Sequence, residues 1–412
     1  MQIRAFEPER DRDAIVRIWR EIGWLKDTDA GREAVLLWLQ AGNALVAEID
    51  GAAECAVSAA PGEIHYLGSK LSFCGITGVA TSHIARHQGL ASEVTATVLA
   101  QAAAEGNAVA GLGMFEQGFY DRLGMGTGGY EYQVCLDPSQ LVLSGKARIP
   151  QRVTLEDWEQ VHAARMARHT GHGGVSLFPA TITRAEMLES ASRGFGLGYR
   201  EGGSGTLSHL VWMVSDNLEH GPYHVAFMAY QTVEQLLELL RALAGLGDQV
   251  DRIILREPAC LRLQDLVRRP LRQQRVTERS EREVGIRAIA AWQFRMLDVP
   301  ACIAALHAPG LDLDVNLVLT DPIERHLPPS APWRGIGGDY VLHLGVDSCA
   351  TRGKRNGLHT ITASAGAFSR LWLGAASARG LAATDALAAP DEILSTLDQG
   401  LRLPQPHVDW DL

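Results

Sequence analysis

The chain has 412 residues, a formal net charge of -10 and 46% hydrophobic residues. This length predicts roughly two to four domains. The acidic balance disfavours nucleic acid as the main partner, because phosphate contacts require clustered lysine and arginine. We expect no membrane span, since no apolar run reaches the roughly 18 residues that one needs. The six cysteines are scattered without a C-x-x-C pair, which favours neither a zinc site nor a disulfide framework. The N-terminus is polar and lacks the apolar core of a signal peptide, so we expect a cytoplasmic protein.

The first block of the chain, residues 1–145, alternates between strand-type and helix-type apolar patterns. Asp50-Gly51 is typical of a two-residue hairpin turn, and Gly106-Asn107 is a stop signal for a long helix. The expected elements are a strand at 2–6, helices at 7–24 and 31–40, a hairpin at 44–60, a strand at 69–81, a helix at 90–105, a strand at 108–114, a short helix at 118–124 and a closing strand at 129–136. Their order is β-α-α-β-β-β-α-β-α-β.

The most informative segment is GVATSHIARHQGLAS, from Gly78 to Ser92, which joins a strand to a long helix through a polar loop. Gly89 allows a ligand to approach the main chain where a Cβ would obstruct it. The N–H groups of the loop and of the new helix form an anion site. Arg86 adds charge to that site and His87 adds a ring donor. A plain polar turn between strand and helix is the alternative that the residues alone leave open.

Two further blocks follow a linker near 144–150. Residues 146–286 are expected to hold a helix capped at Thr154, a glycine-rich strand pair with a mobile turn at 193–205, and a strand–helix–strand unit at 224–258. That unit repeats the order of residues 73–114, but its strand-to-helix junction, AYQTVEQ, has neither Arg nor Gly where an anion loop needs them. Residues 287–412 are expected to form a third domain, with strands around the loop HLPPSAPWRG and an apolar helix near the end.

The pattern R-x-x-G-x-A at Arg86, Gly89 and Ala91 resembles the pyrophosphate loop of the GNAT (Gcn5-related N-acetyltransferase) family, and the first block has the GNAT order of elements. The three blocks together resemble the Eis (enhanced intracellular survival) acetyltransferases. Members join two GNAT domains to a sterol-carrier-protein-like domain. The resemblance rests on the segments at 78–92, 118–128, 296–306 and 369–383. It implies an α/β and α+β chain with an acetyl-CoA-binding GNAT domain at 1–145, a degenerate GNAT-like domain at 146–286 and a sterol-carrier-like domain at 287–412.

The same resemblance implies direct transfer of an acetyl group from acetyl-CoA to a primary amine of an aminoglycoside, polyamine or lysine, without a metal. By position, Tyr120 corresponds to the general acid of the family and the α-carboxylate of Leu412 to its base. A phenol with a pKa of about 10 is suited to return a proton to a leaving thiolate. Family members assemble as hexamers, which implies a homo-oligomer here. The residues implied for acetyl-CoA are Val79, Ala80, Thr81, Arg86, His87, Gln88, Gly89, Leu90 and Ala91.

Two departures from the family pattern keep an alternative open. The consecutive arginines that are usual in the loop become Arg86-His87-Gln88, and the usual aromatic C-terminal residue is Leu412. A catalytically inactive CoA- or lipid-binding module is therefore the second hypothesis. Taken without the family, Tyr120 fits a buried core tyrosine better than a catalytic one, and Leu412 fits a solvated tail better than a catalytic carboxylate. Three histidines fit no zinc spacing and are expected to be structural or to line a substrate pocket, namely His162, His169 and His172.

Overall fold

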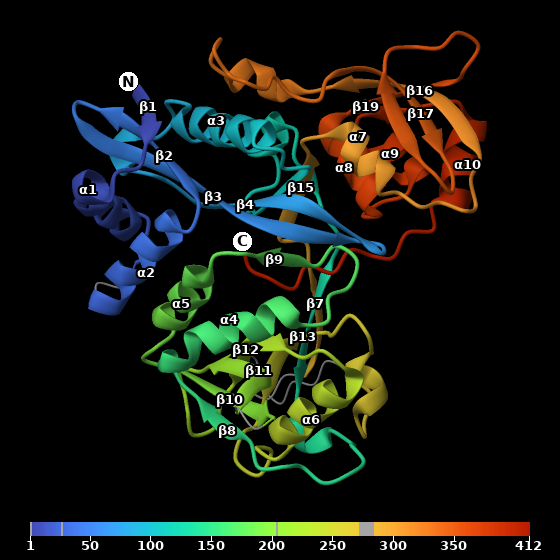
Figure 1. The fold of residues 1–412 in the computed structure, drawn as a ribbon. Helices are drawn as coiled ribbons and strands as arrows, with labels where there is room; N and C mark the ends of the chain where they lie inside the picture. Colours follow the sequence, from blue (N-terminus) through green and yellow to red (C-terminus); the bar gives the residue numbers. More distant parts are fainter. Residues whose placement is uncertain (1, 26–27, 203–204, 272–283) are drawn as a thin grey trace.

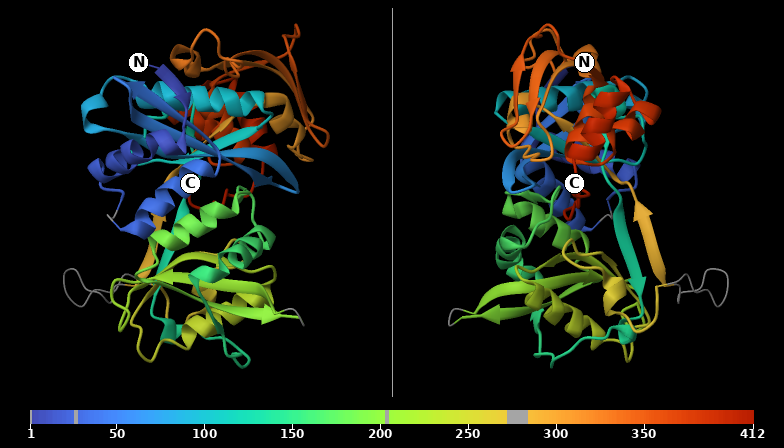
Figure 2. Two further views of the ribbon diagram at one scale, coloured as in Figure 1. Left: turned by 60° about the vertical axis from the view of Figure 1, so that its left-hand side comes forward. Right: turned by 90° about the vertical axis from the view of Figure 1, so that its right-hand side faces the viewer.

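The structure, a computed structural model, describes residues 2–25, 28–202, 205–271 and 284–412. The described chain folds around three sheets, and we call each sheet with its helices a unit. Figures 1 and 2 show the first unit in blue and cyan, the second in green and yellow, and the third in orange and red. The fold class predicted from the sequence, mixed α/β, is confirmed. None of the described helices has the length and apolar character that a bilayer crossing requires.

The first unit contains an eight-stranded sheet in which the strands follow the order β1-β2-β3-β4-β5-β15-β6, with β9 paired to β3. Helices α1 and α2 pack on one face and α3 on the other. The bounds are β1 Gln2–Ala5, α1 Pro8–Glu21, α2 Asp29–Gln40, β2 Asn43–Ile49, β3 Ala52–Tyr66, β4 Ser69–Thr81, α3 Leu90–Ala104, β5 Val109–Gly113, β6 Gly126–Thr127, β9 Val175–Leu177 and β15 Trp292–Met296.

Successive side chains along β2 and β3 point to opposite faces of the sheet. Both faces are covered by helices, so the small apolar residues of these strands are buried on either side. Val46 and Ala56 join the cluster under α1 and α2, whereas Leu45 and Val57 join the cluster under α3. Helix α3 is apolar on nearly all sides, because it lies between this sheet and the segment around Ile323 of the third unit. The third unit is therefore built onto the first.

The second unit contains a seven-stranded sheet in the order β14-β7-β13-β12-β11-β10-β8. Helix α4 packs on one face and α6 on the other, and the capping residue expected at Thr154 forms a capping box with Asp157. The turn expected to be mobile includes 203–204, outside the described residues. The bounds are β7 Glu131–Leu136, β8 Gln151–Val153, α4 Trp158–Ala167, α5 Ala180–Glu189, β10 Gly194–Glu201, β11 Thr206–Val214, β12 Tyr223–Ala229, α6 Val233–Ala244, β13 Ile253–Arg256 and β14 Gly285–Ile289.

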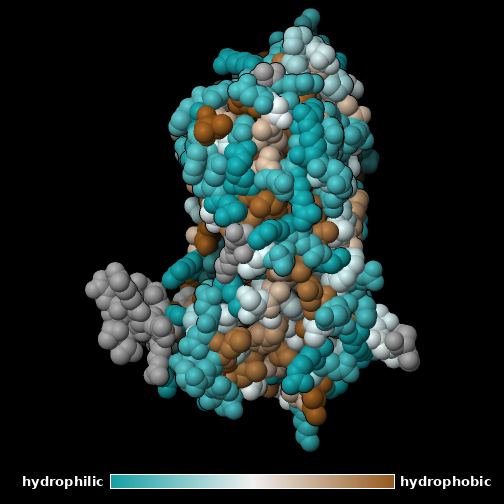
Figure 3. Space-filling model, turned by 90° about the vertical axis from the view of Figure 1, so that its left-hand side faces the viewer, coloured by the Kyte–Doolittle hydropathy of each residue, from teal (hydrophilic) through white to brown (hydrophobic). Residues whose placement is uncertain are grey.

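The third unit contains a five-stranded sheet in the order β18-β17-β16-β19-β20. The bounds are α7 Val299–Ala304, β16 Leu313–Thr320, β17 Gly338–Leu344, β18 Cys349–Arg352, β19 Thr360–Ser364, α8 Ala365–Leu373, α9 Ala378–Thr384, β20 Leu387–Ala388 and α10 Asp391–Gly400. After α10 the chain returns to the middle of the molecule, and the C-terminus lies between the first and second units, near β4 and β9 (Figure 1). The side of the molecule in Figure 3 is mostly hydrophilic over the first unit, with more hydrophobic side chains lower down.

Two strands differ from the sequence prediction in the sheet that they join. The strand expected to close the first block, β7, pairs instead with β13 and β14 of the second unit. The place beside β5 is taken by β15, which pairs with both β5 and β6. Sheet membership therefore crosses the boundaries expected at residues 145 and 286, and that division stays a prediction. The short helix expected at 118–124 is a 3-10 turn of three residues, Asp121–Leu123.

Candidate active site

The first feature of the site is an opening between β4 and β5. The two strands pair in parallel from Phe73–Val109 to Ile76–Leu112. In the described ladder the pairing stops there, although β4 continues to Thr81. A β-bulge accompanies the divergence, because the register on β3 shifts opposite Gly78, whose φ is +64°. The last residues of β4 consequently offer main-chain N–H and C=O groups to an extended ligand on the side that faces β5.

The second feature is the loop that leads from β4 into α3. His87 has a φ of +62° and Gly89 a φ of +82°, so both adopt the left-handed conformation. The first helical bonds run from Ser92 and from the following residue to the carbonyl of Gly89. The N–H groups of the first turn therefore point out of the helix end without a helical partner, where an anion is stabilised. This geometry supports the anion site that the sequence predicts.

A cleft of about 740 Å³ brings these features together. It includes eight of the nine residues predicted for the cofactor, and it also includes Tyr120. The ninth, Gln88, does not line the cleft, because its side-chain amide donates to the carbonyl of Ile84 at 3.2 Å. The lining residues are Ile22, Trp24, Val79, Ala80, Thr81, Ala85, Arg86, His87, Gly89, Leu90, Ala91, Ser92, Phe115, Glu116, Phe119, Tyr120 and Arg122.

Arg122 is a cleft residue that the sequence analysis missed. Its guanidinium lies over the ring of Phe119, 5.0 Å from the ring centroid, at the side of the cleft that carries Tyr120. It gives the cleft a second arginine besides Arg86. The sequence did hold a signal for Arg122 as a cleft residue, because it lies in the segment FYDRLG, two residues after Tyr120.

Tyr120 precedes the 3-10 turn and is only 2% exposed. Its ring packs edge-on against Phe119, with 4.8 Å between the centroids. Burial raises the pKa of the Tyr120 phenol well above its ordinary value, and the nearby Cys55 adds to the rise. The phenol is protonated at neutral pH, and its burial makes it a weaker acid than a solvated phenol.

Leu412 lies on the other face of the same opening. Its side chain packs with the core that holds α1 and α2, whereas Tyr120 packs with the core under α3. A Cβ added at Gly75 would lie 3.1 Å from Leu412 Cδ2, and one added at Gly113 would lie 3.1 Å from a main-chain oxygen of Leu412. Gly75 in the middle of β4 and Gly113 at the end of β5 thus leave space for residue 412 beside the opening. The structure places Tyr120 and Leu412 on opposite sides of the sheet, next to one gap.

The last residues of the chain are fastened to the second unit by buried charges. Arg168 donates to both carboxylate oxygens of Asp409, at 2.8 and 2.7 Å. The indole of Trp410 is buried beneath the guanidinium of Arg165 at 3.7 Å, and its N–H donates to Glu186 at 3.1 Å. These contacts hold the tail in an extended path that ends at the opening between β4 and β5.

Two of the three histidines of the second block, His162 and His172, form hydrogen bonds through both ring nitrogens. His172 accepts from the N–H of Leu67 at 3.1 Å through Nδ1, and its Nε2 donates to the carbonyl of Leu373 at 2.9 Å. It therefore joins the first unit to the third. His162 contacts Thr183 and the carbonyl of Phe178, both at 3.0 Å. In the described ranges there is no group of three His, Cys, Asp or Glu side chains placed to hold a metal ion.

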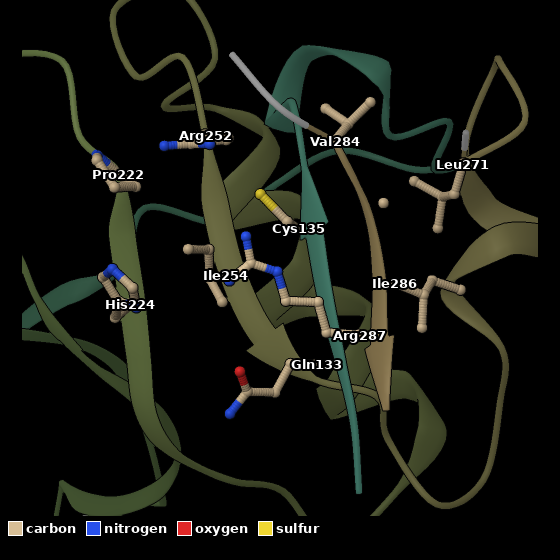
Figure 4. A pocket seen from close by; sticks show the side chains of 11 residues that line it. Gln133, Cys135, Pro222, His224, Arg252, Ile254, Leu271, Val284, Ile286 and Arg287 are labelled. Atoms are coloured by element: carbon tan, nitrogen blue, oxygen red, sulfur yellow. The ribbon is translucent and has the colours of Figure 1, made fainter. Parts of the chain in front are cut away.

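A second hollow of about 740 Å³ lies on the open face of the second sheet, between β12, β13, β7 and β14. Figure 4 shows His224, Ile254 and Cys135 on neighbouring strands of that face, with Arg287 extending across it. None of the residues predicted for catalysis or cofactor binding lines it. It also adjoins the ends of the segment 272–283, which lies outside the described residues. We therefore place the candidate site in the first cleft.

Comparison with known proteins agrees with this placement. Residues 2–128 match the family model described as an acetyltransferase (GNAT) domain. These residues are a GNAT acetyltransferase domain. They carry the bulge, the loop and Tyr120, so this domain contains every residue that lines the cleft. The sequence has no match among curated proteins.

The fold of the whole chain is similar to solved structures of low sequence identity. A conserved protein from Enterococcus faecalis V583, titled a probable N-acyltransferase, has a TM-score of 0.78 at 16% identity and covers 100% of this chain and 99% of its own. A GCN5-related N-acetyltransferase from Kribbella flavida has a TM-score of 0.74 at 19% identity, covering 100% and 98%. Eis1 from Mycobacterium abscessus has a TM-score of 0.74 at 18% identity, covering 100% of both chains. The expected Eis-like architecture with a GNAT domain is thus confirmed at the level of fold.

Proposed function

We propose that the protein transfers the acetyl group of acetyl-CoA directly to a primary amine. The single observation that carries this proposal is the opening between β4 and β5, with Tyr120 on one face of the sheet and Leu412 on the other. An acceptor on the Leu412 face and a cofactor in the cleft would meet only at this gap. Such an arrangement suits attack of the amine on the thioester without a covalent enzyme intermediate.

We assign the parts of acetyl-CoA to two segments of the first unit. The main chain of Val79, Ala80 and Thr81 would pair with the pantetheine arm, and the loop from Arg86 to Ala91 would hold the pyrophosphate. The alternating left-handed conformations of this loop support that role. Gln88 would act within the loop rather than on the ligand, since its amide is bonded to Ile84.

The acetyl carbon is attacked by the neutral amine, the C–S bond breaks, and the thiolate takes a proton. We assign that proton to the phenol of Tyr120, because its side chain lines the cleft beside the opening. The proton that the attacking nitrogen then loses restores the phenol, directly or through water. The α-carboxylate of Leu412, as a chain end, would orient the incoming ammonium and accept its proton, directly or through water. The position of a Leu412 main-chain oxygen beside Gly113 supports this assignment.

The decisive experiment is thiol release from acetyl-CoA by the purified protein, measured against aminoglycosides, polyamines and lysine peptides. Amine-dependent release is the expected result, and it would name the acceptor class. Tight binding of acetyl-CoA without release by any amine would instead favour the inactive CoA-binding module. A variant extended by two alanines after Leu412 tests the carboxylate, because the extension moves the charge without changing any side chain. Unchanged turnover in that variant would remove Leu412 from the mechanism.

The roles of the other two units are part of the same proposal. We infer that the second unit, GNAT-like but without an anion loop at its strand-to-helix junction, serves to hold the tail. There Thr232 caps α6 through its own side chain, which accepts from the N–H of Gln235. We assign the third unit a sterol-carrier-like fold with a role in assembly. Light scattering tests the homo-oligomer, with a hexamer expected from the family resemblance and a monomer as the contrary result.

A further inference from the structure

The turn that carries Tyr120 is held by a strand that comes from far along the chain. Strand β15 is inserted between β5 and β6 of the first sheet, and its label lies at the centre of Figure 1, where the units meet. Two of its side chains, Gln293 and Arg295, are fully buried. Buried polar side chains are costly unless their hydrogen bonds are satisfied, so the partners of these two residues indicate their role.

Each of the two side chains donates one hydrogen bond to the turn that follows Tyr120. Gln293 Nε2 donates to Oδ1 of Asp121 at 2.8 Å, and Arg295 Nη1 donates to the carbonyl of Leu123. The turn itself is short, since the carbonyl of Tyr120 accepts from Leu123 at 2.9 Å and from Met125 at 3.3 Å. Side chains 172 residues away in the sequence therefore fix both ends of this 3-10 turn.

Arg295 is in turn held by the third unit. Its Nη2 donates to Oδ2 of Asp321 at 2.6 Å, and both side chains are almost completely buried. The Asp321 carboxylate also accepts from the N–H groups of Ile323 at 3.2 Å and Ile336 at 2.9 Å. A Cβ at Gly124 would lie 2.9 Å from Arg295 Nη1 and 2.9 Å from Asp321 Oδ1. The turn, the arginine and the aspartate thus form one contiguous contact.

We propose that the Arg295–Asp321 pair, assisted by Gln293, positions the phenol of Tyr120, so that the third unit takes part in the transfer reaction without touching a substrate. The inference rests on the function proposed above, in which Tyr120 is the proton donor. These residues are positioning residues. A small displacement of a proton donor costs a large factor in rate, because the proton must be within hydrogen-bond reach in the transition state.

The test compares two buried ion pairs of the same kind. In the double variant Arg295→Met/Asp321→Asn no buried charge is left unpaired, and Asn still accepts from the main chain. We expect its kcat to fall by at least about tenfold, with the KM for acetyl-CoA changed by less than about twofold. The control is Arg4→Met/Asp11→Asn, which removes a mostly buried pair between β1 and α1 and leaves Glu48 paired with Arg10. The control should lose thermal stability without losing kcat.

A second measurement separates positioning from general damage. In a Tyr120→Phe background, Arg295→Met/Asp321→Asn should cause no further loss of kcat, because the group that it positions is gone. The proposal would be overturned if the double variant lowered kcat by the same factor with Tyr120 present and with Phe in its place. An unchanged kcat in the folded double variant would overturn it as well. If the double variant does not fold, Gln293→Leu replaces it, since a near-isosteric apolar residue removes the bond to Asp121 in the turn and the longer one to Thr127. Full activity of Tyr120→Phe alone would instead overturn the assigned acid.

Discussion

Arg168 and Asp409 are 241 positions apart in the sequence and form a two-bond ion pair in the interior of the protein. The remaining donors of Arg168 are also used, by the carbonyls of Arg165 and Val175 and by the hydroxyl of Ser176. The pair joins the second unit to the tail three residues before Leu412. The second unit therefore holds the part of the chain that places Leu412 beside the candidate site.

Removing this arginine should both destabilise the protein and slow the reaction. Arg168→Met leaves Asp409 buried without its partner, which costs about 3–5 kcal/mol of unfolding free energy. Equilibrium denaturation measures that loss, and Arg168→Met/Asp409→Asn should recover a large part of it. In the folded double variant kcat should stay low, because the neutral pair no longer fixes the tail. Recovery of kcat along with stability would show that the pair does not position Leu412.

Tyr120→Phe should lower kcat by about 10²-fold or more, since general acid catalysis contributes factors of this size. The binding of acetyl-CoA, measured by calorimetry, should change little, because the phenol ring is retained. Tyr66→Phe is the matched control. Tyr66 is also a buried tyrosine, but its hydroxyl donates to the carbonyl of Trp372 at 2.7 Å and lies outside the cleft. The control should lose stability only. Equal kcat values for the two variants would contradict the assignment.

Gly89→Ala should weaken binding of acetyl-CoA. The space around a Cβ at Gly89 is open, with Glu93 Oε1 at 3.7 Å, but the φ of +82° costs an alanine about 1–2 kcal/mol. The loop would relax away from the geometry that presents its N–H groups. Gly106→Ala is the matched control at the other end of α3, with a φ of +91° and nothing within 4 Å. Both variants should lose stability, whereas only Gly89→Ala should raise the KM for acetyl-CoA. A KM raised equally in both would show that strain in α3, not the loop, is responsible.

Stability should fall with acid below about pH 6.5. Burial lowers the pKa of His162 to about 4, and the charge of Arg165 contributes to the lowering. Between pH 6.5 and 4 the unfolded chain binds a proton that the folded chain excludes, so the free energy of unfolding decreases as pH falls through this range. Denaturation at several pH values checks this, and His162→Gln should reduce the slope. His220→Gln, at an exposed position, should leave the slope as it is. An identical slope for both variants would assign the effect to other groups.

Much of the cofactor side of the site could be predicted from the sequence, because local residues determine it. The strand, the loop and the start of α3 follow one another within the segment Gly78–Ser92. Glycine supplies the left-handed conformation at position 89. The helix end then presents its N–H groups without help from distant residues. The short pattern FYDRLG likewise placed Tyr120 at the cleft, although Arg122 of the same pattern was overlooked.

The tertiary structure alone decided which strands complete each sheet and what surrounds the opening. Strand β7 has a pattern that would satisfy either sheet, and pairing with β13 and β14 was settled by contacts between distant segments. Strand β15 took the place beside β5, and with it came Arg295 and its partner Asp321. Side-chain periodicity gives the face that a strand buries but not its neighbour. The sequence therefore determined the local loop, and it predicted the residue that we propose as the acid. Long-range pairing and buried ion pairs determined how Tyr120 and Leu412 meet at one gap.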